Sequence, residues 1–326
     1  VDPRAQRVQS ALLARDHPRR DDAERLSLRP PLARSFALGV NATERRVTGH
    51  VDLAFRRRYD LSNSFGVLLA TGPRSTGATT SYTRYVGRTR DTNNRIGFLS
   101  AGVGLDRLVE GFTSAEEGGL RSSLVLGGGY NTKVFHIDPR EGSSLVAQVR
   151  GSVVSNDDGT VGLSLTPTIR ANVTLPTGLR GALVWVSSVA WVFGDPLPGE
   201  RPGLGGPFHL RGYLTHEIVA DGAAFTVVEQ RFTPFTDLAF DALHVAWLRE
   251  IQLALFAGLG GAFGATDGRD AVLAAEVGAG IRIHFEYFGI QPGLFSVDLG
   301  VPLVRDSPFQ RTLSPVTVVI GFDQFF

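Results

Sequence analysis

Apolar and polar residues alternate with a period of two in segments of roughly 10 to 14 residues, which recur from about residue 33 to the end of the chain. The segment 275–285 illustrates the pattern, because its odd positions carry apolar side chains and its even positions carry small or polar ones. Successive side chains of a strand point to opposite faces, so such a segment has one apolar face. The pattern predicts an all-β fold of antiparallel strands.

We expect fourteen strands, separated by stretches rich in turn-forming residues. Bacterial barrels made from one chain have an even number of strands, so this count is admissible. The N-terminal third is rich in arginine and poorly patterned, which leaves sixteen strands as the alternative. The expected strands are 34–44, 47–58, 63–72, 79–90, 96–111, 120–136, 144–156, 160–175, 179–193, 223–236, 249–262, 273–286, 293–303 and 315–326.

Alternation alone does not tell which face meets water. In a soluble sandwich the apolar face points inward, whereas in a membrane barrel it meets lipid and charged side chains line the lumen. The large number of long strands, the mixture of short turns and long loops, and aromatic residues near expected strand ends all favour the membrane. The chain also has no apolar run of about 18 residues, the length that a membrane-spanning helix needs. We therefore predict that residues 33–326 form a transmembrane antiparallel β-barrel of the bacterial outer membrane, with aromatics such as Trp185, Trp191, Phe288 and Phe326 at its two interfaces.

Residues 1–32 do not show the strand pattern. Apolar residues in 4–15 have near-helical spacing, and Pro18 with the charged run that follows it would end a helix there. We expect a short N-terminal helix and a linker, with a solvated tail as the alternative. Methionine is absent even at position 1, so we also expect that an N-terminal segment, a secretory signal, was removed.

Composition excludes several classes of function. The net charge of +1 gives no basic field for nucleic acid, and Lys133 is the one lysine among 33 basic residues. The absence of cysteine excludes disulfides and thiolate chemistry. No histidine spacing suits a metal, no Gly-x-Ser-x-Gly elbow is present, and no phosphate-binding loop follows the glycine run at 127–129. We expect no enzyme activity, no cofactor and no metal.

A Gly/Pro-rich connection at 194–222 carries the motif Leu210-Arg211-Gly212-Tyr213. An arginine in a partly dry lumen needs carboxylate partners. Three acidic residues occupy positions in later strands that the alternation predicts to face inward. Glycine permits a tight turn of the backbone, and tyrosine adds an aromatic face with a polar end. We expect a loop that folds inward and is pinned there. Its expected partners on the wall are Glu229, Arg231, Glu276, Arg282 and Asp298.

This motif, with the Glu229 to Phe232 segment behind it, resembles the BamA-like superfamily of outer-membrane insertases and two-partner-secretion transporters. Three later segments resemble the last strands of that family in the same order: 277–282, 295–303 and 321–326. The resemblance implies a barrel whose sixth extracellular loop folds into the lumen, and whose weak seam between first and last strands admits a client strand or distorts lipid. Gly321, Phe322 and Phe326 match in part the family's seam and the C-terminal assembly signal of outer-membrane barrels.

Two departures from the family matter. Where the family commonly has an acidic residue, this chain reads Phe256 to Gly260, so one partner of the loop arginine is missing. The family's periplasmic POTRA domains also find no room in about 30 residues before the barrel, so we expect a separate periplasmic partner protein. The strand glycines have a second interpretation, which is that they make space for the loop tip.

Two functions follow from these patterns. The first is movement or insertion of polypeptide, or of lipid, by a barrel with a loop-plugged lumen and a weak lateral seam. Its partners would be outer-membrane lipid, a polypeptide client and the periplasmic protein. The alternative is a passive or substrate-selective pore whose lumen charges set selectivity.

Overall fold

The computed structural model of this chain describes residues 32–322 except for 44–45, 58–59, 72–74, 87–96, 109–118, 134–138, 158, 179, 197–199, 215–216, 237, 239, 243–245, 266–269, 288–290 and 305–315. The N-terminal helix expected at 4–15, its linker, and Phe288 and Phe326 lie outside the described residues. Nothing described therefore bears on the division of the chain at residue 32.

The described elements are strands, and fourteen of them are six residues or longer. Each of these overlaps one of the segments expected from the alternation, which confirms the all-β class. The long strands are β1 (Leu32–Thr43), β2 (Arg46–Arg57), β3 (Asp60–Thr71), β4 (Ser75–Val86), β5 (Gly97–Leu108), β6 (Gly119–Asn131), β7 (Gly142–Asn156), β8 (Val161–Thr177), β9 (Gly181–Trp191), β12 (Ile218–Phe235), β14 (Ala246–Ala265), β15 (Ala271–Tyr287), β16 (Gln291–Pro302) and β17 (Thr317–Phe322). The short ones are β10 (Phe193–Gly194), β11 (Gly203–Leu204) and β13 (Phe240–Ala242). The strand count of the whole chain, fourteen or sixteen, stays a prediction.

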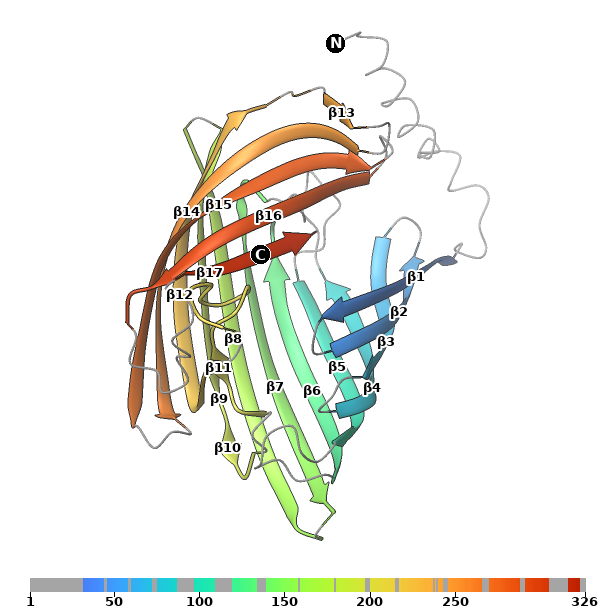
Figure 1. The fold of residues 1–326 in the computed structure, drawn as a ribbon. Coiled ribbons are helices and arrows are strands. Elements are labelled where there is room, and N and C mark those ends of the chain that lie inside the picture. The colour runs from blue at the N-terminus through green and yellow to red at the C-terminus, as the bar shows by residue number, and fades with distance from the viewer. Residues whose placement is uncertain are drawn as a thin grey trace.

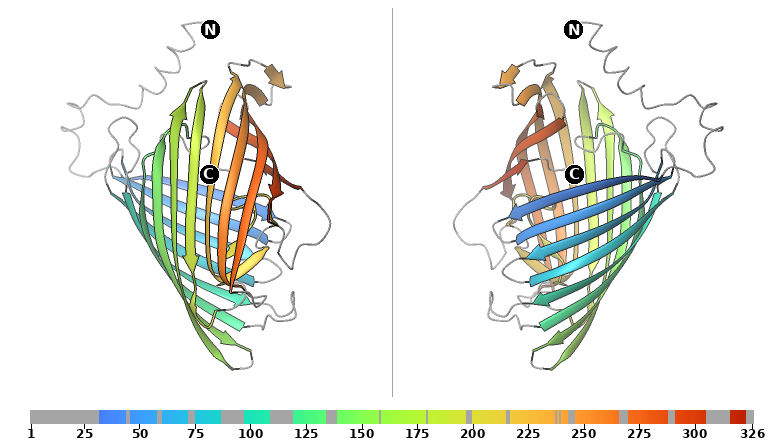
Figure 2. Two further views of the ribbon diagram at one scale, coloured as in Figure 1. Left: turned by 90° about the vertical axis from the view of Figure 1, so that its left-hand side faces the viewer. Right: turned by 90° about the vertical axis from the view of Figure 1, so that its right-hand side faces the viewer.

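The long strands form one antiparallel meander. Each pairs with the next along the chain, and β12 lies between β9 and β14, where Glu229 is opposite both Val184 and Phe256. Figures 1 and 2 show the strands curving around a common interior, with β1 in dark blue at one edge and β17 in red at the other. No register joins β1 to β17 among the described residues, so the structure shows the antiparallel sheet and not its closure.

The two faces of the sheet have opposite polarity. On β15 the side chains of Val277 and Ile281 are 41% and 49% exposed, whereas Glu276 and Arg282 are each 1% exposed. The same inversion runs along β14, where Leu255 and Leu259 are exposed and Gln252 is buried. Apolar side chains thus cover the outer face, and charged ones are buried on the inner face. This is the orientation of a membrane barrel and the reverse of a soluble sandwich.

Aromatic residues on the outer face include a stacked pair near one end of the sheet. The rings of Trp191, at the end of β9, and Phe263, on β14, have centroids 6.0 Å apart. Trp185, expected near a strand end, instead lies inside β9, where its indole N–H donates to Thr226 at 2.7 Å. Among the described residues, no helix is long and apolar enough to cross a membrane.

The long connection predicted at 194–222 ends earlier than expected, because β12 already begins at Ile218. Asp221-Gly222 reads as a turn in the sequence, but both residues continue the strand. Gly222 lies against the indole of Trp191, and a Cβ at this position would come within 2.3 Å of that ring. The glycine therefore serves packing between β12 and β9 rather than a turn.

The sheet has two ends. The terminal end is the end at which β1 begins and β17 finishes, and the loop end is the opposite one. In the meander, β9 runs toward the loop end, so the connection that follows it starts there. The connection from β6 to β7 lies at the terminal end.

Candidate functional site

The connection between β9 and β12 folds back onto the inner face of the sheet. Leu204, in the short strand β11, and Leu210 are 0% exposed, and Tyr213 is 1% exposed. Figure 1 shows this segment on the inner side of the curved sheet, beside β12. Burial of these three side chains gives the loop a dry interface with the wall. The wall residues of the same apolar cluster are Val184, Val186, Ile218, Ala220, Ala223, Phe225, Val227, Phe256, Ala262, Ala265, Val272 and Ala274.

Backbone hydrogen bonds within the loop present its tip to the wall. The amide of Gly206 donates to the carbonyl oxygens of Leu210 and Tyr213, at 3.1 and 3.0 Å. Gly205 and Gly206 have φ values of 101° and 104°, a region that glycine adopts without the steric cost of a side chain. This local closure turns Arg211 and Gly212 outward from the loop and toward the strands.

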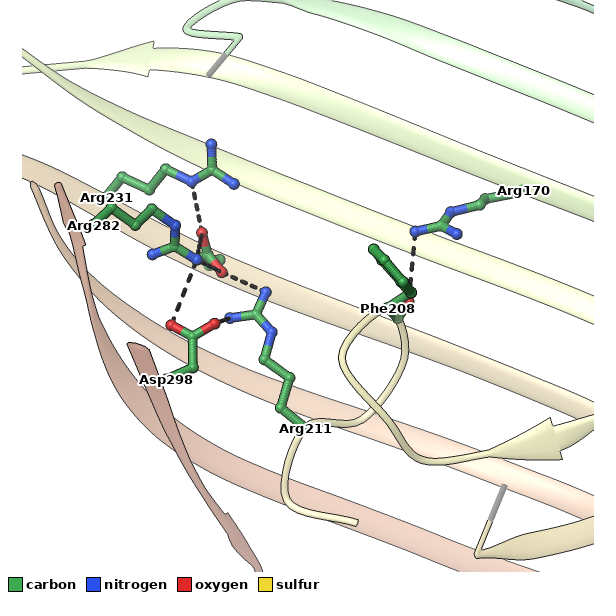
Figure 3. A network of polar contacts seen from close by, with 7 residues as sticks. Arg170, Phe208, Arg211, Arg231, Arg282 and Asp298 are labelled. Carbon is green, nitrogen blue, oxygen red and sulfur yellow. Dashed lines mark hydrogen bonds and ion pairs between the residues drawn. The ribbon is translucent and has the colours of Figure 1, made fainter. Parts of the chain in front are cut away.

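Arg211 binds two carboxylates and an aromatic ring. Its guanidinium lies 2.6 Å from Glu229 Oε2 on β12 and 3.1 Å from Asp298 Oδ2 on β16 (Figure 3). Its Cζ also lies 4.4 Å from the ring centroid of Phe256 on β14, a cation–π contact. Phe256 stands where the resembled family has an acidic residue. The loop arginine thus gains an aromatic face there, and Asp298 supplies the second carboxylate.

Glu229 is the centre of the charged network. Besides Arg211, it accepts hydrogen bonds from Arg231 Nε at 2.6 Å and from Arg282 Nη2 at 3.0 Å. Arg282 also lies 3.7 Å from Asp298. The side chains of all five residues are at most 4% exposed, so the charges depend on one another for solvation.

The backbone of Gly212 binds the last three strands. Its amide donates to Glu276 on β15, and its carbonyl oxygen accepts from Thr317 Oγ1 on β17 at 2.9 Å. Gly300 on β16 lies directly beneath, and a Cβ at this position would come within 2.6 Å of the Gly212 nitrogen. The absence of a side chain at both glycines therefore permits backbone-to-backbone contact between loop tip and wall.

Tyr213 fixes the tip from the other side. Its hydroxyl lies 2.7 Å from the carbonyl oxygen of Val304 and 3.0 Å from that of Ala275, and it accepts from the amide of Ala275 at 3.1 Å. Burial raises the pKa of Tyr213, so the hydroxyl keeps its proton and can donate to one of the two carbonyls. The side chain thus joins the loop to β15 and to the residues that follow β16.

A second anchor holds the beginning of the loop to the opposite part of the wall. Glu200 accepts from Ser164 on β8 at 2.8 Å and lies 3.7 Å from Arg121 on β6. Arg121 in turn donates to Asp106 on β5 at 2.8 Å. The loop is therefore fixed at both sides of the interior, by Glu200 to β6 and β8 and by Arg211 to β12 and β16.

The structure brings most of the residues expected at the site together. The four motif residues and the five wall residues expected to partner them lie in one buried assembly. Gly321 lies in β17, opposite Ser296 of β16, and Phe322 ends that strand, opposite Phe295. Sequence reasoning missed Phe256, Thr317 and the Glu200 anchor. Phe256 lies at an inward-facing position of β14, as the alternation of the sequence predicts. Its contact with Arg211 could not be predicted from that alternation.

Comparisons with known proteins give one kind of match. No family model matches the chain, and no curated protein matches it. Among solved structures, 67 chains match. One is the crystal structure of BamA from Haemophilus ducreyi lacking POTRA domains 1–3. It has a TM-score of 0.46 and 11% sequence identity, and the match covers 90% of this chain and 70% of that chain.

The arrangement has no described metal-ligand cluster: within the described residues, no group of three or more histidine and acidic side chains is placed to hold a metal ion. What the site can do is hold a loop. It couples the tip of one connection to strands β12 and β14–β17 through buried ion pairs, hydrogen bonds and close backbone contacts.

Proposed function

We propose that this protein is an outer-membrane barrel that moves or inserts polypeptide, or lipid, without hydrolysing a substrate. The observation that carries the proposal is the docked loop tip. Gly212 bonds to β15 and β17, and Gly300 of β16 touches it, so the loop crosses the inner face of the last three strands. A loop in this place would restrict passage through the interior, and it reaches the strand at which the barrel would open.

The apolar outer face supports the membrane location. Leucine, valine, isoleucine and aromatic side chains are exposed along the strands from β3 to β17, far more than a water-soluble surface tolerates. Lipid is the medium that makes such a surface stable. We infer that this medium is the bacterial outer membrane, where single-chain barrels of this kind occur.

The edge strands support lateral opening. β17 pairs with β16 over Thr317–Phe322, and its other edge has no partner among the described residues. An unpaired edge presents backbone donors and acceptors to which an extended segment can add as a strand. A seam between β1 and β17 would be the weakest junction of the closed barrel. It gives a polypeptide client, or a lipid, a route between interior and membrane.

A selective pore is the second candidate, and one observation favours it. Arg150 lies on the inward parity of β7 and is exposed, whereas Ser152 and Val154 on the same face are buried. Water therefore reaches part of the inner face beside the loop. If that space runs through the barrel, charged lining residues such as Arg150 would favour anions.

Substitution Arg211→Ala is expected to raise conductance in planar lipid bilayers. Loss of the guanidinium removes both carboxylate contacts and the contact with Phe256, so the tip leaves the wall and the interior opens. Arg107→Ala is the matched control, because Arg107 pairs with Asp157 and both side chains are more than half exposed. A steady large channel in the unmodified protein would favour the pore instead. Equal conductance of all three proteins would contradict loop docking as the plug.

Insertion can be measured directly in liposomes. We expect liposomes containing the protein to accelerate folding of a urea-denatured eight-stranded outer-membrane barrel, compared with empty liposomes. A parallel sample with fluorescent phospholipid measures transfer of lipid between leaflets. Activity in neither assay, together with a steady ion channel, would replace the proposal by the selective pore.

A further inference from the structure

The docked loop is attached to β12 well before its tip. Arg201 forms an ion pair with Asp221 of β12, and the carbonyl oxygen of Pro202 accepts from the amide of Ala220 at 3.0 Å. The next two residues form β11, which pairs with the first residues of β12. Backbone pairing thus holds this part of the loop to β12 as a short added strand.

The apolar contacts of the loop lie on the same side of the interior. Leu204, Leu210 and Tyr213 belong to one cluster of buried side chains, and the wall residues of that cluster come from β9, β12, β14 and β15. Within the part of the chain that the structure describes, the cluster has no member from β5–β8. Burial of apolar surface is the dominant favourable term in packing. The loop is therefore packed as one unit with β12 and the strands that follow it.

On the opposite side, the loop reaches the wall formed by β5–β8 through contacts of wall side chains. Glu200 lies 2.8 Å from Ser164 on β8 and 3.7 Å from Arg121 on β6, and its side chain is 3% exposed. Nearer the tip, the carbonyl oxygen of Phe208 accepts from Arg170 on β8 at 3.5 Å, which is longer than a usual hydrogen bond (Figure 3). Glu200 is thus the buried attachment of the loop to this wall.

Release of Glu200 would leave Arg121 with a carboxylate partner. Arg121 donates to Asp106 on the neighbouring strand β5 from Nε and Nη2, at 3.2 and 2.8 Å. These bonds lie within the sheet, so they persist when Glu200 moves into water. Breaking a buried ion pair is costly when the remaining partner stays buried without an opposite charge. That cost does not arise at Arg121.

Release of the loop tip would cost much more. Arg211 would leave Glu229, Asp298 and the ring of Phe256 together. Gly212 would lose its hydrogen bonds to β15 and β17 in the same step. Of the two attachments, the Glu200 contact is therefore the one that opens first.

Water already reaches the β5–β8 wall close to Glu200. Ser152 on β7 lies opposite Ser164 and is 4% exposed. Arg150 lies on the same inner face, two positions further from the loop end, and is exposed. Glu200 thus lies at the boundary between a covered part and a water-exposed part of this wall.

We infer that the interior opens between the loop and the β5–β8 wall while the loop stays docked on β12–β17, and that Glu200 is the latch of this opening. Movement of the loop together with β12 would extend the water-exposed surface at Arg150 to the loop end. The path would then run along β5–β8, away from the seam between β1 and β17. This inference does not rest on transport of polypeptide or lipid, because it concerns the contact at which the interior opens.

Glu200→Ala is expected to raise the open fraction in planar bilayers by about tenfold or more, as for loss of a charged hydrogen bond. Its unfolding midpoint should stay close to that of the unmodified protein, because Arg121 keeps Asp106. Asp157→Ala is the matched control, since Asp157 pairs with Arg107 near the loop end and both side chains are more than half exposed. Its open fraction should equal that of the unmodified protein. An equal open fraction in Glu200→Ala would contradict the latch.

Cross-linking tests which side of the loop opens, because the chain has no cysteine of its own. In Glu200→Cys/Ser164→Cys, a short bis-methanethiosulfonate linker joins the loop to β8. In Arg201→Cys/Asp221→Cys, made in the Glu200→Ala background, the same linker joins the loop to β12. We expect the first linker to abolish the openings and dithiothreitol to restore them, whereas the second linker should leave them unchanged. Openings that persist with the first linker, or that disappear with the second, would overturn the inference.

Discussion

Glu229→Gln is expected to cause the largest loss of stability of any single side-chain change in the site. The carboxylate accepts hydrogen bonds from three arginines, and it is 2% exposed. Glutamine has nearly the same shape but no charge, so Arg211 and Arg282 would keep Asp298 but lose the Glu229 carboxylate, and Arg231 would lose its ion pair with Glu229. Removal of one partner from a buried ion pair costs about 3–5 kcal/mol, and we expect the free energy of unfolding to fall by at least that amount.

Denaturant titrations in lipid vesicles, followed by the fluorescence of the three tryptophans, measure this loss. Glu286→Gln is the matched control, because Glu286 pairs with Arg249 at 2.5 Å and both side chains are about one-third exposed or more. A partly exposed pair contributes roughly 1 kcal/mol or less. Similar values for the two variants would show that the Glu229 network is not the main support of the docked loop.

Gly300→Ala is expected to displace the loop tip from the wall. The added Cβ would lie 2.6 Å from the Gly212 nitrogen and 2.7 Å from the Arg211 carbonyl carbon, and both neighbours are backbone atoms. The tip must move away, which weakens the Thr317 hydrogen bond and the contact between Arg211 and Asp298. We expect a stability loss of about 1–3 kcal/mol and a rise in bilayer conductance.

Gly151→Ala separates this steric effect from the general effect of replacing a strand glycine. Gly151 lies in β7, and a Cβ there would meet its nearest atom, in Leu165, at 4.0 Å. Alanine is better tolerated than glycine in a strand, so this control should be neutral or more stable by about 0.5–1 kcal/mol. Equal conductance of the two glycine variants would refute close backbone packing as the reason for Gly300.

The fold could be read from the sequence because its dominant signal is local. The side-chain period of two assigns each residue to a face, so Glu276 and Arg282 could be placed inside and Val277 outside without knowledge of the neighbouring strands. Local composition misled at Asp221-Gly222, which form part of β12. The conformation of these two residues depends on contact with Trp191 on another strand, and the sequence preferences of turns do not include such contacts.

The sequence predicted which residues belong to the site, but not how these residues contact one another. Parity placed Glu229, Glu276 and Asp298 on the inner face, and the chemistry of arginine required carboxylates. The alternation could not predict which group each carboxylate contacts. In the structure Arg211 pairs with Glu229 and Asp298, whereas Glu276 accepts a hydrogen bond from the amide of Gly212. That assignment depends on the depth at which the loop enters, which is set by packing of Leu210 against glycines of β14.

The reach of the docked tip has a consequence for the order in which the protein assembles. Gly212 bonds to partners that lie 64 and 105 residues later in the chain, so the tip has no complete binding site until β15, β16 and β17 are in place. Contacts of such long sequence separation form late in folding. Until then Arg211 lacks its ion pair with Asp298, and water occupies the interior. The loop would therefore dock only after the sheet is complete. In a chain truncated before Thr317, the loop tip would not be held against the wall.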